Sequence, residues 1–276
     1  MLSDHPLPAI LGAVGREFRP LNTAVHIERQ HRIDTCSVRL VQYKGRSALF
    51  VLTGVGPSNA AVSVRALLDV WHVSLLLSIG YAGAVQEGLN VGDVIGVDAL
   101  RRAAPNWRGP IQPAGAGLFR SDAALLQGAE CAARELGISW RRGASLTVPE
   151  VIAQPATKRW IGEMYGVDCV EMESAVIAEA AVEHGLRHAT LRAVSDAIDD
   201  EVPSSPWFNS AAEEQSASQS TEAQTRGGSS FEKSTASAAH RACVEAELRR
   251  GLMANTELAS ANLGRLVLRL LEGRII

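Results

Sequence analysis

A chain of 276 residues, of which 46% are hydrophobic and 21% are charged, is long enough to bury one sizeable core. The formal net charge is −3, and both signs are interleaved along the sequence. This leaves no broad basic surface, so the composition argues against nucleic acid or an anionic membrane as a partner. It favours small-molecule chemistry in a single domain over residues 1–276.

Short runs rich in Val, Ile and Leu alternate with amphipathic segments, which is the pattern of an α/β protein. We expect a three-layer sandwich in which helices cover both faces of a mixed, mostly parallel sheet. The predicted strands are 9–14, 38–43, 47–53, 75–79, 93–97 and 189–194. The predicted helices are 58–70, one that begins at Ser121, 172–183, 241–253 and 258–271.

The composition changes abruptly over residues 201–240, where Ser, Ala, Gln, Thr and Glu predominate. Such a segment buries too little apolar area to offset the entropy lost on ordering. We therefore expect a disordered or lid-like insertion there, followed by C-terminal helices over 241–276.

The sequence indicates neither a secretory signal nor a membrane span, so we expect a cytoplasmic location. Its four cysteines are widely scattered and lack any ligand spacing. This pattern argues against a disulfide framework and against a metal site.

Carboxylates and glycines stand in several short motifs that occur in a fixed order. The motifs are GVGPSNAA at 54–61, IGYAGA at 79–84, VGDV at 91–94, VEMES at 170–174 and RAVSD at 192–196. Together they resemble the nucleoside phosphorylase and nucleosidase superfamily, and within it the methylthioadenosine/S-adenosylhomocysteine nucleosidases. The resemblance covers about residues 9–199.

The resemblance implies a purine nucleosidase that acts on adenine-type nucleosides and needs no metal or organic cofactor. Cleaving such a nucleoside requires a protonated leaving base and a stabilised ribosyl cation. By resemblance, Asp196 donates a proton to N7 of the base, Glu173 binds the ribose hydroxyls, and Glu17 orients the attacking water. Arg192, close in sequence, would oppose the protonation of Asp196 if it faced that carboxylate.

The resemblance also implies further substrate contacts. They are Met172 against the sugar, Val151 and Ile152 against the base, and Gly80, Tyr81, Ala82 and Ser195. Tyr81 departs from the nucleosidases, which commonly have a small hydroxyl residue at this place. A tyrosine there would occupy more of the pocket, so the identity of the substrate stays open.

Two alternatives to hydrolysis remain at this point. A phosphorylase of the same fold could act on a purine nucleoside or an adenosyl-hopanoid, since Arg16, Arg19, Arg65 or the 54–59 loop could hold an anion. A sensor could retain the fold and bind nucleosides without turnover. The resemblance further implies a homodimer or higher oligomer, and a role in purine nucleoside catabolism and methionine salvage.

Overall fold

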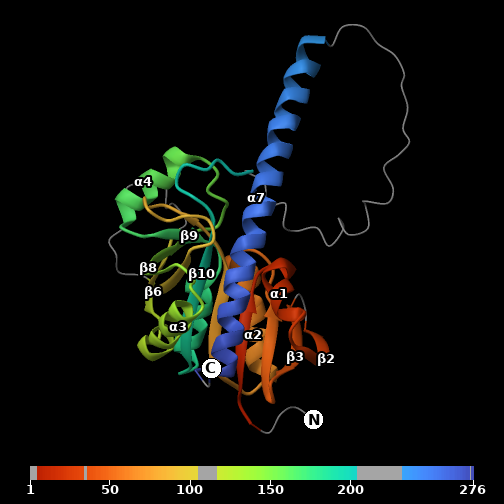
Figure 1. Cartoon of the computed structure of the whole chain (residues 1–276), viewed down its shortest axis with the longest axis vertical. Helices are drawn as coiled ribbons and strands as arrows, with labels where there is room; N and C mark the ends of the chain where they lie inside the picture. The colour runs from red at the N-terminus through yellow and green to blue at the C-terminus, as the bar shows by residue number, and fades with distance from the viewer. Residues whose placement is uncertain (1–4, 34–35, 105–116, 204–231, 274) are drawn as a thin grey trace, which may run out of the picture.

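The structure is a computed structural model that describes residues 5–33, 36–104, 117–203, 232–273 and 275–276 (Figure 1). Within these residues, one sheet contains β1 (Leu7–Gly12), β2 (His26–Ile33), β3 (Cys36–Tyr43), β4 (Arg46–Leu52), β5 (Val73–Ala84), β6 (Val94–Arg102), β7 (Leu118–Arg120), β8 (Trp140–Thr147), β9 (Cys169–Glu171) and β10 (Arg187–Asp196). The helices are the short 3-10 helix η1 (Gly15–Phe18), α1 (Arg19–Asn22), α2 (Pro57–Val70), α3 (Ala123–Glu135), α4 (Pro155–Tyr165), α5 (Ser174–Glu183) and α7 (Glu232–Glu272).

The sheet closes on itself at one end and is open at the other. The strands β5, β10, β6, β8 and β9 pair in a ring, whereas β1, β4, β3 and β2 extend from β5 as an open arm. Parallel pairings join β1 to β4 and β5, β5 to β10, and β8 to β6 and β9. Antiparallel pairings join β3 to β2 and β4, β5 to β9, and β6 to β7 and β10. The predicted mixed sheet is confirmed, but its parallel pairings do not predominate.

Helices pack against both faces of the sheet around β1 and β5. Successive residues of a strand point to opposite faces. Accordingly, Ile10 packs into a core with α3 and α7, whereas Ala9 and Leu11 pack into a second core with α2 and α5. On α7, the predicted apolar stripe docks on the sheet, and Leu263 and Leu266 are fully buried there. This burial explains why the C-terminal part of the chain returns to the sheet.

Each predicted strand overlaps an observed one, but four observed strands were not predicted. β2 is exposed along most of its length, so it carries no apolar alternation. β7 and β9 have only three residues each, and β8 begins with Trp140, Arg141 and Arg142. The predicted start at Ser121 is also shifted, because α3 is capped by Asp122, whose carboxylate accepts the N–H groups of Ala124 and Leu125.

The two predicted C-terminal helices form one continuous helix, α7. In Figure 1 its first half projects beyond the sheet, and its second half runs alongside it. Of the predicted disordered or lid-like insertion at 201–240, residues 232–240 are helical and residues 204–231 lie outside the described part, so the insertion stays a prediction. The Ala-rich composition of 236–246 favours helix and outweighs the low hydrophobicity. No helix in the described ranges is long and apolar enough to cross a membrane.

Candidate active site

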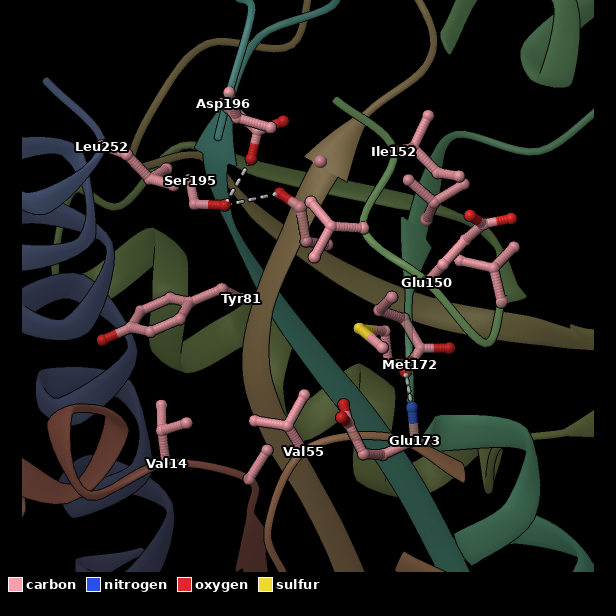
Figure 2. Close-up of a pocket in the computed structure, with 18 of the residues that line it drawn as sticks. Val14, Val55, Tyr81, Glu150, Ile152, Met172, Glu173, Ser195, Asp196 and Leu252 are labelled. Carbon is pink, nitrogen blue, oxygen red and sulfur yellow. Dashed lines mark hydrogen bonds between the residues drawn. The ribbon is translucent and has the colours of Figure 1, made fainter. Parts of the chain in front are cut away.

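A cavity lies beyond the C-terminal ends of β1 and β10, beside the last residues of β5. Its walls are formed by Ala13, Val14, Glu17, Val55, Tyr81, Ala82, Gly83, Val148, Glu150, Val151, Ile152, Val170, Glu171, Met172, Glu173, Ser195, Asp196, Val202 and Leu252. Figure 2 shows Asp196 and Ser195 at one end and Glu173 and Val55 at the other. Of the predicted site residues, all but Gly80 line this cavity.

Glu17 is a buried carboxylate that backbone groups hold from two sides. Its Oε2 atom accepts the N–H groups of Ala13 and Val14 at 2.6 and 3.0 Å, and Oε1 accepts that of Tyr81 at 3.2 Å. A carboxylate offers about four acceptor positions, so one is left for a water molecule in the cavity. Burial raises the pKa of Glu17, although Arg192 and these N–H groups pull it down. The result is a stronger base than an exposed glutamate.

Glycines make room for the carboxylates of the site. A Cβ atom on Gly80 would come within 3.0 Å of both Glu17 and Arg192, and one on Gly83 would do so with Asp196. The sequence predicted that Gly80 contacts substrate, but the structure places it behind Glu17 instead. Its small size therefore serves the close approach of charged side chains to the β5 backbone.

Glu173 stands immediately before α5 and reaches across to the start of α2. Its Oε1 atom accepts the N–H group of Gly56 at 2.8 Å, so the N-terminus of α2 holds this carboxylate. Burial raises the pKa of Glu173 to about 8, against the pull of Arg192 and with added repulsion from Glu171. Gly56 donates to one oxygen only, so the Glu173 carboxyl group keeps further hydrogen-bonding positions at the cavity wall, where ribose hydroxyls could bind.

Glu171 differs from Glu173 because its acceptor positions are already filled. Its Oε2 atom accepts from the backbone of Glu173, from Ser174 and from Arg192, while Oε1 accepts from Thr147. Burial alone would raise the pKa of Glu171, but Arg192 and these hydrogen bonds lower it below its usual range. Glu171 is therefore an ionised structural anchor, whereas Glu173 is available to ligand.

Asp196 is bound on both carboxylate oxygens. Ser195 donates from Oγ to Oδ1 at 2.6 Å, and the ammonium of Lys158 lies 2.5 Å from Oδ2. The cation beside Asp196 is thus Lys158, not the Arg192 considered from the sequence. Arg192 instead lies 3.0 Å from Glu171 and 3.8 Å from Glu173.

Tyr81 does not fill the cavity as its size suggested. Figure 2 shows its ring along one wall with the hydroxyl directed toward α7, where it hydrogen-bonds to Ser260. On the opposite side, the loop after β8 brings Val151 and Ile152 to the wall, and Met172 lies nearer Glu173. The Asp196 end is therefore mainly apolar, which suits a flat heteroaromatic base.

Several residues of the site carry no sequence signal. Lys158 and Leu252 belong to no motif, and each reaches the site from a separate helix, α4 or α7. Glu171 is part of the VEMES motif, but the sequence alone does not show that its role differs from that of Glu173. The two glutamates differ in the groups that surround each of them in the folded chain.

Glu173→Gln should make the folded chain more stable than wild type as the pH rises. The raised pKa means that, between about pH 4.5 and 8, folded wild type holds a proton that the unfolded chain releases. The stability that the protonated Glu173 side chain contributes is therefore complete below pH 4.5 and is lost as the pH approaches 8. Glutamine mimics the protonated acid at every pH. The difference in free energy of unfolding, variant minus wild type, should increase by at most about 1.4 kcal/mol per pH unit.

Urea denaturation at pH 5, 6.5 and 8 measures this difference. Glu179→Gln is the matched control, because Glu179 lies on α5, the helix that follows Glu173, but forms an exposed ion pair with Arg102. It should shift stability by less than about 1 kcal/mol at each pH. A Glu173→Gln difference that stays constant from pH 5 to pH 8 would contradict the prediction.

Two known proteins with related sequences are named as nucleosidases. The chain is 30% identical over 199 residues to the 5′-methylthioadenosine/S-adenosylhomocysteine nucleosidase of Actinobacillus succinogenes, covering 70% of this chain and 86% of that one. It is 29% identical over 198 residues to the enzyme of the same name from Bacillus licheniformis, covering 68% and 84% of the two chains.

Solved structures share the fold at lower sequence identity. The 5′-methylthioadenosine/S-adenosylhomocysteine nucleosidase of Neisseria meningitidis, in complex with methylthio-immucillin-A, superposes with a TM-score of 0.73 at 20% identity, over 98% of this chain and 100% of that one. The futalosine hydrolase of Helicobacter pylori superposes with a TM-score of 0.72 at 16% identity, over 97% and 98% of the two chains.

The family profile described as the phosphorylase superfamily matches residues 9–226. The matched segment includes β1 with the loop to Glu17, the turn before α2, and the strands that carry Tyr81 and Asp196. Since it spans well over half of the 276 residues, the chain belongs to the phosphorylase superfamily.

Proposed function

We propose that the chain is a purine nucleosidase that hydrolyses the N-glycosidic bond of an adenine nucleoside such as 5′-methylthioadenosine or S-adenosylhomocysteine. The observation that carries the proposal is the charge of the cavity. Five of the described lining residues are acidic, namely Glu17, Glu150, Glu171, Glu173 and Asp196, and no described lining residue is Lys or Arg. Such a lining favours a ribosyl cation and disfavours a phosphate ion.

Each acid has a place that suits one part of the reaction. Asp196, at the apolar end, would protonate the leaving base, while Glu173, at the other end, would bind the ribose hydroxyls. Glu17 would take a proton from the water that attacks C1′ of the ribose. The relatives named as methylthioadenosine/S-adenosylhomocysteine nucleosidases support the adenine base.

Phosphorolysis receives less support from the groups that the sequence offered as phosphate ligands. Arg16 and Arg19 line a second cavity, which shares Tyr81 with the first. Arg65 is exposed on α2, and the N–H group of Gly56 is occupied by Glu173. A phosphate ion beside Glu17 and Glu173 would meet carboxylates without a compensating cation in the lining.

The test is a product analysis of purified protein with 5′-methylthioadenosine, S-adenosylhomocysteine, inosine or adenosine, with and without phosphate. We expect free adenine and a free reducing sugar from an adenine nucleoside, at a rate that phosphate does not change. A sugar 1-phosphate formed only with phosphate would replace hydrolysis by phosphorolysis. Tight binding without base release would instead identify a sensor.

A further inference from the structure

Lys158 contacts Asp196 but has no role in the reaction proposed above. Its side chain is fully buried, on the first turn of α4. The ammonium contacts Asp196 Oδ2 at 2.5 Å and donates to the carbonyl oxygens of Ala197 and Asp200, each at 2.8 Å. An ammonium has three N–H donors, so every one of them has a partner.

Such a position is unfavourable for a lysine that serves packing alone. Lysine is almost never fully buried unless it is paired, because removing its charge from water is unfavourable. The first turn of a helix also disfavours a positive charge, because the helix dipole is positive there. The contact with Asp196 is therefore the interaction that accounts for this cation.

The other charged residues that line the hollow beside the pair are acidic. Ser195 occupies the other oxygen of Asp196, and Asp200, Glu201 and Glu247 of α7 line a hollow that Asp196 shares. Asp200 Oδ2 accepts the N–H group of Ala197, and Glu201 accepts the side-chain amide of Gln154. Among the described residues, Lys158 is the cation in contact with Asp196.

We propose that Lys158 is the positioning residue of Asp196 and the source of the proton that the leaving base takes up. This inference rests on the proposed function. A proton passes from the Lys158 ammonium to the Asp196 carboxylate at Oδ2, and the carboxyl group so formed gives it to N7 of the purine. The bond from C1′ to N9 breaks with its electron pair going to the base. Lys158, left neutral, regains its proton from solvent, while Glu17 returns to solvent the proton taken from water.

A substrate that needs no proton on its leaving group separates this role from a structural one. Lys158→Met should lower kcat for 5′-methylthioadenosine by about 100-fold, as Asp196→Asn should. With 4-nitrophenyl riboside, whose phenolate leaves unprotonated, both variants should stay within about threefold of wild type. Arg159→Met is the matched control, because Arg159 follows Lys158 on α4 and forms an exposed ion pair with Asp199 of the loop after β10. It should leave both rates unchanged.

The pH profile supplies a second readout. Without Lys158, Asp196 must take its proton from solvent, so the ratio of Lys158→Met activity to wild-type activity on the adenine nucleoside should rise as the pH falls. Glu17 is present in both proteins, so its own titration cancels in this ratio. Asp200, Glu201 and Glu247 are present in both proteins, so the difference between the profiles reports the lysine. If Lys158→Met does not fold, Lys158→Gln, which keeps an amide donor for the carbonyl oxygens, makes the same comparison.

The outcomes distinguish the inference from the proposed function. Equal losses on the two substrates, with parallel pH profiles, would show that Lys158 only stabilises the loop after β10, and would overturn the inference while leaving nucleosidase activity intact. A wild-type protein that releases neither adenine nor nitrophenolate would overturn both.

Discussion

Glu17→Gln should lower kcat for 5′-methylthioadenosine by about 1000-fold and leave KM within about threefold of wild type. The carboxylate accepts three backbone N–H groups and keeps one acceptor position for water. Glutamine fills the same space but cannot take a proton from that water. Because the lost interaction matters in the transition state rather than in substrate binding, the effect should fall on kcat.

The pH profile of the same variant gives an independent check. Burial raises the pKa of Glu17, and a general base works only when it is deprotonated. The activity of wild type should therefore fall on the acid side at a higher pH than for an ordinary glutamate, and Glu17→Gln should lose this dependence. Glu28→Gln on the exposed strand β2 serves as the control. A Glu17→Gln variant that keeps more than a tenth of wild-type kcat would remove Glu17 from the mechanism.

The acidic residues of the site were predicted through the resemblance of the motifs to the superfamily, and in the structure two of them follow strand ends. Glu17 comes shortly after β1 and Asp196 ends β10, and both strands run parallel to β5. The carboxyl ends of parallel strands meet at one edge of a sheet, which is where ligands bind in α/β folds. The resemblance of the motifs to the superfamily therefore named Glu17, Glu173 and Asp196, and the strand ends explain why the fold brings them to one cavity.

The direction of Arg192 could not be predicted, because an irregularity in β10 controls it. Residues four apart on a regular strand share a face. In β10 the register with β5 shifts between Val194 and Asp196, so the usual alternation is interrupted. Arg192 then turns toward Glu171, while Asp196 turns toward Lys158.

The ring of strands also escaped prediction, and with it the partners that come from α4 and α7. The ring depends on β9, a three-residue strand that pairs with Gly83 and Ala84. A strand this short has no measurable periodicity. Lys158 and Leu252 reach the site through tertiary packing, which no local pattern in their own helices encodes.

Arg192→Met should lower the free energy of unfolding by about 3–5 kcal/mol at pH 7. Arg192 is almost completely buried, and its guanidinium donates to Glu171, Ser174 and Ser78. Its removal leaves the ionised Glu171 without a cation, while Glu173, with a pKa of about 8, stays largely protonated at pH 7. Breaking a buried pair by removing one partner leaves an uncompensated charge, and this is why the expected loss exceeds the worth of the pair itself.

Urea denaturation at pH 7 measures the loss, and Arg187→Met provides the matched control on the same strand. Arg187 forms a half-exposed ion pair with Asp122, so its removal should lower the free energy of unfolding by less than about 1 kcal/mol. The double variant Arg192→Met/Glu171→Gln should regain part of the stability, because it removes the stranded charge as well as its partner. Equal losses for Arg192→Met and Arg187→Met, or no recovery in the double variant, would show that Arg192 contributes by packing and not by balancing the glutamates. In that case the pKa of Glu173 would have to be set by burial alone. The stability that Glu173→Gln adds with rising pH should then be the same in the Arg192→Met background as in the native one.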